Sequence, residues 1–88
     1  MKTIKEYLLD KKCVTPQTVY LPKGAEIVAI NDSNTEFNLV AIINPMEATT
    51  ELHTFKVCLP GENLYVDTVK YIGSFKGSFG LEYIVELL

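Results

Sequence analysis

Residues that break regular structure recur at short intervals along this chain, and their spacing limits what it can fold into. The breakers are Pro16, Pro22-Lys23-Gly24, the polar run 31–34, Asn44-Pro45, Pro60-Gly61 and the glycine-rich stretch 73–80. The segments between them are rich in Ile, Val, Tyr, Phe and Thr, which favour strands. No segment shows the 3.6-residue period of an amphipathic helix. The chain is therefore expected to be mainly β.

We expect strands over seven segments: 2–9, 17–21, 25–30, 35–43, 51–59, 69–75 and 81–87. Turn-forming residues predict two hairpins. One joins 25–30 to 35–43 through a four-residue loop at 31–34, and the other joins 69–75 to 81–87 with its tip around Lys76-Gly77. Residues 63–70 fit either a strand or one loose turn. In segment 51–59, alternation places His53, Phe55 and Val57 on one face.

The predicted fold is a single β-rich domain over residues 1–88, because 88 residues support one modest core. Six to seven short strands favour a small antiparallel sandwich or a half-open barrel. Such sheets leave edge strands, and edges that are not blocked tend to pair with another chain. A homo-oligomer is therefore expected.

Charge and hydropathy exclude several classes of function. The net charge is −3, and all eight basic residues are lysines. An acidic chain without arginine is poorly suited to duplex nucleic acid. The longest apolar run, 39–43, is too short for a membrane helix, and Glu6 and Asp10 interrupt any signal-peptide core. Cys13 and Cys58 lack zinc-site spacing and are expected to be reduced.

Catalytic chemistry is not indicated. His53 is the single histidine, no nucleophile motif accompanies it, and a lone histidine within a strand is expected to be a half-buried packing residue. The carboxylates on predicted strands, Glu51, Glu82 and Glu86, fit solvated faces better than an acid–base pair. We expect no enzyme activity, no catalytic residue, no metal and no cofactor.

The glycine- and aromatic-rich segment 70–80 is the strongest candidate for ligand binding. Its rings are suited to stacking on a nucleobase, and its serines, lysine and glycine backbone to meeting phosphates. A lysine in the 22–24 turn is a further candidate. The candidate ligand-binding residues are Lys23, Tyr71, Ser74, Phe75, Lys76, Ser78 and Phe79. The alternative is that segment 70–80 is only a hairpin whose rings cover the sheet edge.

Five stretches carry a family resemblance: QTVYLPKGA at 17–25, LVAIINP at 39–45, FKVCLPG at 55–61, YIGS at 71–74 and YIVE at 83–86. In this order they span nearly the whole chain, which resembles a family of small tailed-phage proteins of unknown function. The chain differs from that pattern at Val40, where a tryptophan is usual, and at Tyr83, where a histidine is frequent. Pro60-Gly61 replaces a Thr-Gly turn.

The resemblance implies a phage origin and similarity to anti-defence proteins that sequester cyclic nucleotides. The leading expectation is a phage-encoded, non-enzymatic, homo-oligomeric sponge that holds a cyclic nucleotide immune signal of the host in the host cell cytoplasm. Two alternatives stay open. One is an inhibitor that docks on a host defence protein, and the other is a minor structural or assembly protein of the virion.

Overall fold

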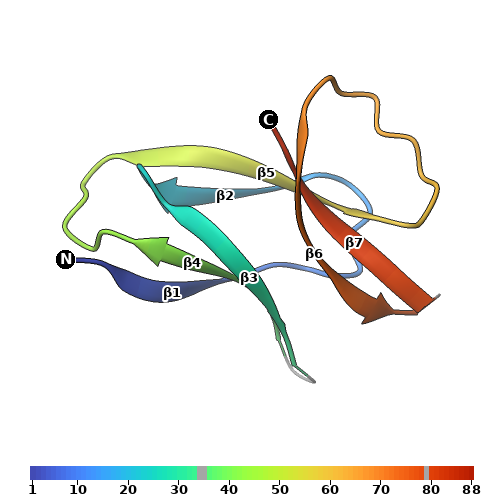
Figure 1. The fold of residues 1–88 in the computed structure, drawn as a ribbon, viewed down its shortest axis with the longest axis horizontal. Helices are drawn as coiled ribbons and strands as arrows, with labels where there is room; N and C mark the ends of the chain where they lie inside the picture. The colour runs from blue at the N-terminus through green and yellow to red at the C-terminus, as the bar shows by residue number, and fades with distance from the viewer. Residues whose placement is uncertain (34–35, 79) are drawn as a thin grey trace.

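Seven strands make up the regular structure of the computed structural model, which describes residues 1–33, 36–78 and 80–88 (Figure 1). They are β1 (Thr3–Leu8), β2 (Gln17–Pro22), β3 (Glu26–Asp32), β4 (Phe37–Ile43), β5 (Thr50–Cys58), β6 (Val69–Gly77) and β7 (Gly80–Leu87). Each predicted strand segment overlaps one of them. No helix occurs in the described residues, and none is therefore available to cross a membrane.

The strands form two antiparallel sheets. One has three strands in the order β1-β4-β3, and the other has four strands in the order β2-β5-β7-β6. The hairpins predicted from the turn residues are confirmed as β3–β4 and β6–β7. Because neither sheet closes on itself, the predicted small antiparallel sandwich is the architecture observed.

Several predicted strand boundaries differ from the structure, two of them where a predicted turn belongs to a strand. β3 continues through Asp32, which pairs with Phe37, so the loop expected at 31–34 begins too early. β6 continues through Gly77, which pairs with Gly80, so Lys76-Gly77 belong to a strand and not to the hairpin tip. Glycine lacks a side chain but still forms the backbone ladder, which explains this second error. Of the ambiguous segment 63–70, residues 63–68 are irregular, and β6 begins at Val69 as predicted.

The core lies where the inner faces of the two sheets meet. On β4, alternate residues Phe37, Leu39, Ala41 and Ile43 are buried, as expected for a strand with one face in the core. The facing side chains of the four-stranded sheet include Leu21, Phe55, Phe75 and Ile84. Burying each large side chain contributes about 1.5–3 kcal/mol before entropy is counted.

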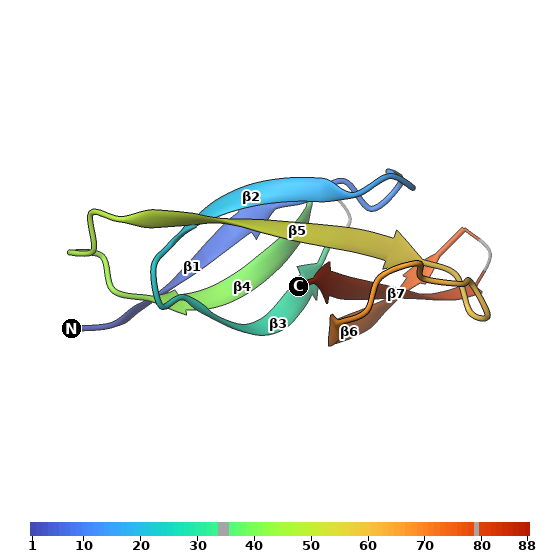
Figure 2. The same cartoon turned by 90° about the horizontal axis from the view of Figure 1, so that it is seen from above.

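β3 and β6 are the strands through which the sheets touch most closely. Gly73 on β6 makes room for Ile30 on β3, because a Cβ at position 73 would lie 2.8 Å from Ile30 Cδ1. The molecule is flat, with extents of 40 × 33 × 16 Å (Figure 2). Its accessible surface of 5853 Å² exceeds the roughly 5,200 Å² expected for this mass. The flat shape therefore leaves an unusually large share of the chain exposed.

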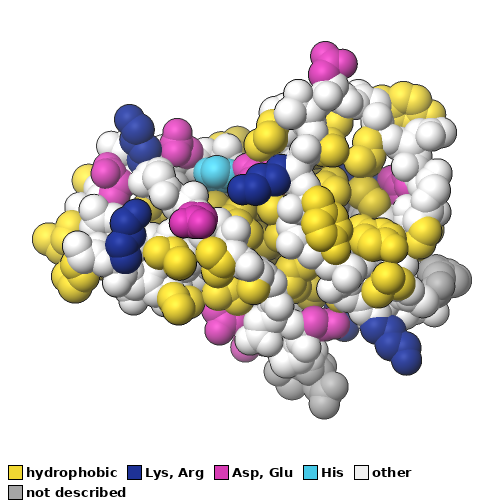
Figure 3. Space-filling view, in the orientation of Figure 1, with side chains coloured by type: hydrophobic (Ala, Val, Ile, Leu, Met, Phe, Trp, Pro, Cys, Tyr) yellow, Lys and Arg dark blue, Asp and Glu magenta, His cyan; other side chains and the backbone are white. Residues whose placement is uncertain are grey.

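Much of this exposed surface is apolar. Fifteen large hydrophobic residues in the described part of the chain are more than 40% exposed. Some lie over β6 and around the N-terminal end of the chain, where hydrophobic side chains gather in the space-filling view (Figure 3). Where such side chains form a contiguous patch, the patch is a candidate contact with another molecule.

Candidate functional site

The loop between β1 and β2, residues 9–16, is fixed at both ends. Leu9 is buried, and its N–H donates to the Phe37 carbonyl oxygen over 2.8 Å. Asp10 and Gln17 exchange two hydrogen bonds, since the Asp10 N–H donates to Gln17 Oε1 and Gln17 Nε2 donates to the Asp10 carbonyl oxygen (2.8 and 2.7 Å). The loop is thereby held against both sheets.

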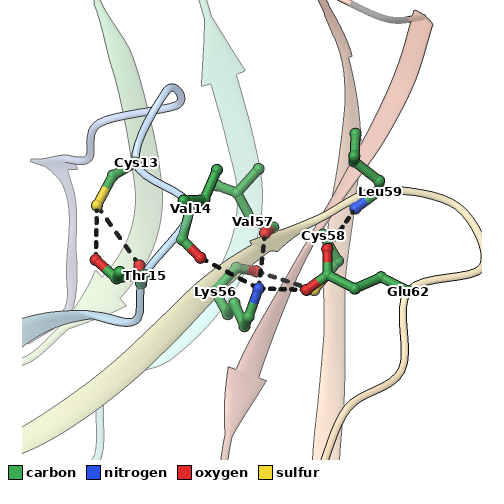
Figure 4. Close-up of polar contacts among 8 residues, drawn as sticks. All are labelled: Cys13, Val14, Thr15, Lys56, Val57, Cys58, Leu59 and Glu62. Atoms are coloured by element: carbon green, nitrogen blue, oxygen red, sulfur yellow. Dashed lines mark hydrogen bonds and ion pairs between the residues drawn. The ribbon is translucent and has the colours of Figure 1, made fainter.

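Lys56 on β5 holds the same loop from a second side (Figure 4). Its ammonium donates to the Val14 carbonyl oxygen at 3.3 Å and pairs with Glu62 Oε2 at 2.5 Å. The Lys56 hydrogen bond, with a weaker one from the Leu59 N–H, lowers the pKa of Glu62. One largely buried lysine therefore joins the β1–β2 loop, β5 and the β5–β6 loop.

The tip of the β1–β2 loop carries two adjacent lysines. Asp10 Oδ1 accepts the Lys12 N–H over 2.9 Å, which closes a tight Asx turn. Lys11 Nζ lies 3.0 Å from Asp32 Oδ1 on β3. Lys12 forms no ion pair with any residue that the structure describes. The turn thus presents one lysine tied to β3 and one that is available to a ligand.

A cleft of about 450 Å³ separates this loop from the β6–β7 hairpin. It is lined by Lys11, Lys12, Phe75, Lys76, Gly77, Ser78 and Glu82. The lining contains three lysines and one glutamate. Although Lys11 is paired with Asp32, Lys12 and Lys76 still outnumber Glu82, so the cleft lining is net positive in an acidic chain. The volume of the cleft falls within the range of small-molecule sites.

Glu82 supplies the negative charge of the cleft. It pairs with Phe75 across the β6–β7 ladder, and its carboxylate lies so close to Gly77 that a Cβ there would overlap it. Gly77 therefore lets a carboxylate lie flat against the backbone, where it can accept hydrogen bonds from a ligand.

Three of the seven predicted binding residues line the cleft: Phe75, Lys76 and Ser78. Lys76 and Ser78 are exposed. The Phe75 side chain is only 5% exposed, and its ring lies 4.6 Å from that of Phe37, measured between centroids. The ring is a core element beneath the cleft, and this placement does not fit the expected stacking on a base.

The other predicted residues lie elsewhere. Tyr71 and Ser74 are exposed on the outer face of the four-stranded sheet, where Tyr71 packs 6.2 Å from the Tyr83 ring. Lys23 occupies the β2–β3 turn, at the opposite end of the molecule from the β6–β7 tip (Figure 1). Phe79 lies outside the described residues.

Sequence reasoning missed Lys11, Lys12 and Glu82 as cleft residues. The available signal was the pair of lysines after Asp10, a residue that commonly begins tight turns. A second, smaller hollow of about 180 Å³ adjoins the same turn and shares both lysines. Two carboxylates, of Asp10 and Glu36, line that hollow, which makes it less suited to an anion.

His53 and Glu86 form a pair on the inner face of the four-stranded sheet. His53 Nδ1 lies 2.5 Å from Glu86 Oε2, and the ring stacks on Phe55. The expectation of a half-buried packing histidine is confirmed, since its side chain is 21% exposed. The expectation that Glu86 is solvated is wrong: it is buried because its register opposite Phe55 points it inward. Neither residue lines the cleft.

Both cysteines are free, as expected. Cys58 is buried, and burial raises the pKa of its thiol, which makes it unreactive. Cys13 is half-buried in the β1–β2 loop and contacts Thr15. Within residues 1–33, 36–78 and 80–88, no cluster of three His, Cys, Asp or Glu side chains is placed to hold a metal ion.

Comparison with known proteins adds a family to this description. No curated protein and no solved structure matches the chain. One family does match, and the match covers residues 1–84, nearly the whole domain. The chain therefore belongs to the family described as Domain of unknown function (DUF7352).

Proposed function

We propose that this protein binds a small phosphate-bearing ligand in the cleft between the β1–β2 loop and the β6–β7 hairpin. The observation that carries the proposal is the convergence of Lys11, Lys12 and Lys76 on one cleft in a chain of net charge −3. Charge-assisted hydrogen bonds from ammonium groups to phosphate oxygens are among the stronger polar interactions in proteins. The Ser78 hydroxyl and the Gly77 backbone add neutral polar groups.

The proposal includes the biological role that the family resemblance implies. In that role the protein is a phage-encoded, homo-oligomeric sponge in the host cell cytoplasm, and the ligand is a cyclic nucleotide immune signal. Sequestration needs affinity and no chemical step. The loop is already held by Leu9, Gln17 and Lys56, so little ordering entropy is lost when a ligand arrives.

Calorimetric titration of the purified protein with cyclic dinucleotides, cyclic trinucleotides and inorganic pyrophosphate tests the proposal. We expect binding of a cyclic nucleotide and its recovery unchanged, as judged by mass spectrometry. Lys12→Ala and Lys76→Ala should each weaken binding about tenfold, since a hydrogen bond to a charged group contributes about 1.5–3 kcal/mol. Lys23→Ala is the matched control and should bind as wild type.

Several results would overturn parts of the proposal. If no compound of the panel produces heat, ligand binding is excluded. Equal losses in Lys23→Ala and Lys76→Ala remove the cleft as the site. Recovery of a cleaved nucleotide removes the non-enzymatic role. Binding of pyrophosphate as tight as that of any nucleotide reduces the site to a phosphate site without base recognition.

A second candidate function, docking on another protein, is supported by the outer face of the four-stranded sheet. Tyr20 and Leu52 are directly paired across β2 and β5 and are 68% and 53% exposed, and Tyr71 on β6 is 60% exposed. A host defence protein or a virion component would be the partner. A stoichiometric complex that is lost in Tyr20→Ser and kept in Lys76→Ala would favour this function over ligand capture.

A further inference from the structure

The two sheets have four edge strands, and three of them carry features that oppose pairing with another chain. β2 follows Pro16 and ends in Pro22, and prolines cannot donate to a ladder. β3 and β6 each contain a register shift of the kind that a β-bulge produces. Among the described strands, β1 is the edge with neither a bulge nor a flanking proline.

β1 is also the most exposed strand. Its register with β4 is continuous from Thr3 to Leu8. Five of its six residues are exposed, and Tyr7 is half-buried. Ile4 and Leu8 are 68% and 69% exposed and lie on the outer face with Glu6. Proteins generally avoid a regular edge strand that exposes large apolar side chains, unless that edge is paired with another strand.

We propose that β1 pairs with β1 of a second copy of this chain, antiparallel about a two-fold axis, with Ile4 opposite Ile4 of the partner subunit. The proposal rests on the homo-oligomeric part of the proposed function and assigns it a surface. It joins two three-stranded sheets into one sheet with the order β3-β4-β1-β1-β4-β3.

Symmetry and charge select this register. A two-fold axis perpendicular to the sheet places one residue of β1 opposite itself, and the cross-strand pairs follow from that choice. Centring on Lys5 brings two ammonium groups together, and centring on Glu6 brings two carboxylates together, which destabilises the pair. Centring on Tyr7 draws the buried Leu9 into the ladder.

Centring on Ile4 avoids these conflicts. It pairs the two exposed Ile4 side chains at the axis and places Lys2 opposite Glu6 of the partner subunit, twice by symmetry. Each such apolar or oppositely charged pair stabilises an antiparallel ladder. The axis lies toward the N-terminal end of β1, whereas Lys11 and Lys12 follow its C-terminal end, so the cleft stays outside this interface.

Charge exchange tests the register. We expect the wild type to sediment as a dimer at micromolar concentration and Lys2→Glu to raise the dimer Kd at least tenfold. The double variant Lys2→Glu/Glu6→Lys should return the Kd to within about threefold of wild type, because the pair is restored with reversed sign. Lys5→Glu makes the same charge change on the same strand, opposite Thr3, and should leave the Kd unchanged.

Cross-linking provides a second readout, because Glu6 also accepts hydrogen bonds from Asn31 and Asn38 and its replacement can weaken the sheet. In a Cys13→Ser background, Ile4→Cys should form an inter-subunit disulfide under mild oxidation. Lys5→Cys should not, since two such residues are diagonal in the ladder and about 7–8 Å apart, beyond disulfide reach.

The inference is overturned by a wild type that sediments as a 9.9 kDa monomer at micromolar concentration or by a dimer that Lys2→Glu leaves intact. It is also overturned if Lys2→Glu and Lys5→Glu weaken the dimer equally, or if Ile4→Cys fails to cross-link. A monomer that still binds ligand in the cleft removes the dimer and leaves ligand capture standing, so the two failures are distinguishable.

Discussion

Replacing Phe75 separates a core role from a ligand-stacking role. Phe75→Leu removes three side-chain carbons, which at about 0.8 kcal/mol per buried carbon is about 2 kcal/mol. Loss of the tilted contact with Phe37 adds about 0.5–1.5 kcal/mol. We expect the free energy of unfolding to fall by about 2.5–3.5 kcal/mol in Phe75→Leu, which is the sum of these two contributions, and by about 3–5 kcal/mol in Phe75→Ala.

Urea unfolding at 25 °C and calorimetric titration of the same samples provide the assay. Phe75→Leu should stay folded, since a domain of this size has a net stability of about 4–13 kcal/mol. Its ligand affinity should change less than twofold. Tyr71→Leu, at a 60% exposed position, is the control and should cost less than about 0.5 kcal/mol. Phe75→Leu with wild-type stability and at least tenfold weaker binding would refute the core assignment.

Three further predictions concern single features of the fold. The lowered pKa of Glu62 favours the folded state when this carboxylate is ionised. The difference in free energy of unfolding between wild type and Glu62→Gln should therefore be at its maximum above pH 5. It should disappear as the pH falls below about 4.3 and through the lowered pKa, as measured by urea unfolding at each pH. A difference that does not depend on pH would contradict this. Gly24 has a φ of 82°, and a Cβ added there would meet no described atom within 4 Å. Gly24→Ala should therefore lower the free energy of unfolding by about 1–2 kcal/mol through backbone strain alone, and Gly24→Asn should lower it less. Equal melting temperatures for the wild type and both variants would show the reasoning to be wrong. His53→Leu leaves the Glu86 carboxylate buried without a partner and should lower the free energy of unfolding by about 3 kcal/mol. The double variant His53→Leu/Glu86→Leu should recover at least half of that loss. A double variant no more stable than the single one would count against a buried pair.

The alternation of apolar and polar residues along the chain is sufficient to predict most of the strands. In segment 51–59 it places Phe55 and Val57 on one face, and both are buried in the core. Turn residues locate both hairpins, because Asn, Asp and Ser at 31–34 and the glycines at 73–80 favour turns through local backbone effects whatever the tertiary context. Boundaries are harder to predict, since Asp32 and Gly77 form ladder pairs in spite of their low strand propensity.

The candidate site is only partly predictable. Local composition identifies Lys76 and Ser78, but Lys11 and Lys12 are far from them in sequence. The two segments meet because the three-stranded and four-stranded sheets pack face to face, and no local pattern encodes that packing. The expectation that Phe75 stacks on a ligand failed for the same reason. A phenylalanine flanked by glycines is typical of an exposed ring, and its burial follows only from the facing sheet.

Mapping the ligand on the folded chain tests the central claim most directly. Backbone amide chemical shifts would be followed by NMR while a cyclic dinucleotide or trinucleotide that binds by calorimetry is added. We expect the largest shifts at residues 10–13 and 76–78, on the two sides of the cleft, with Lys23 and Tyr20 unaffected. Shifts that gather instead around Lys23, or across the outer face at Tyr20 and Leu52, would contradict the assignment of the lysine-lined cleft as the binding site.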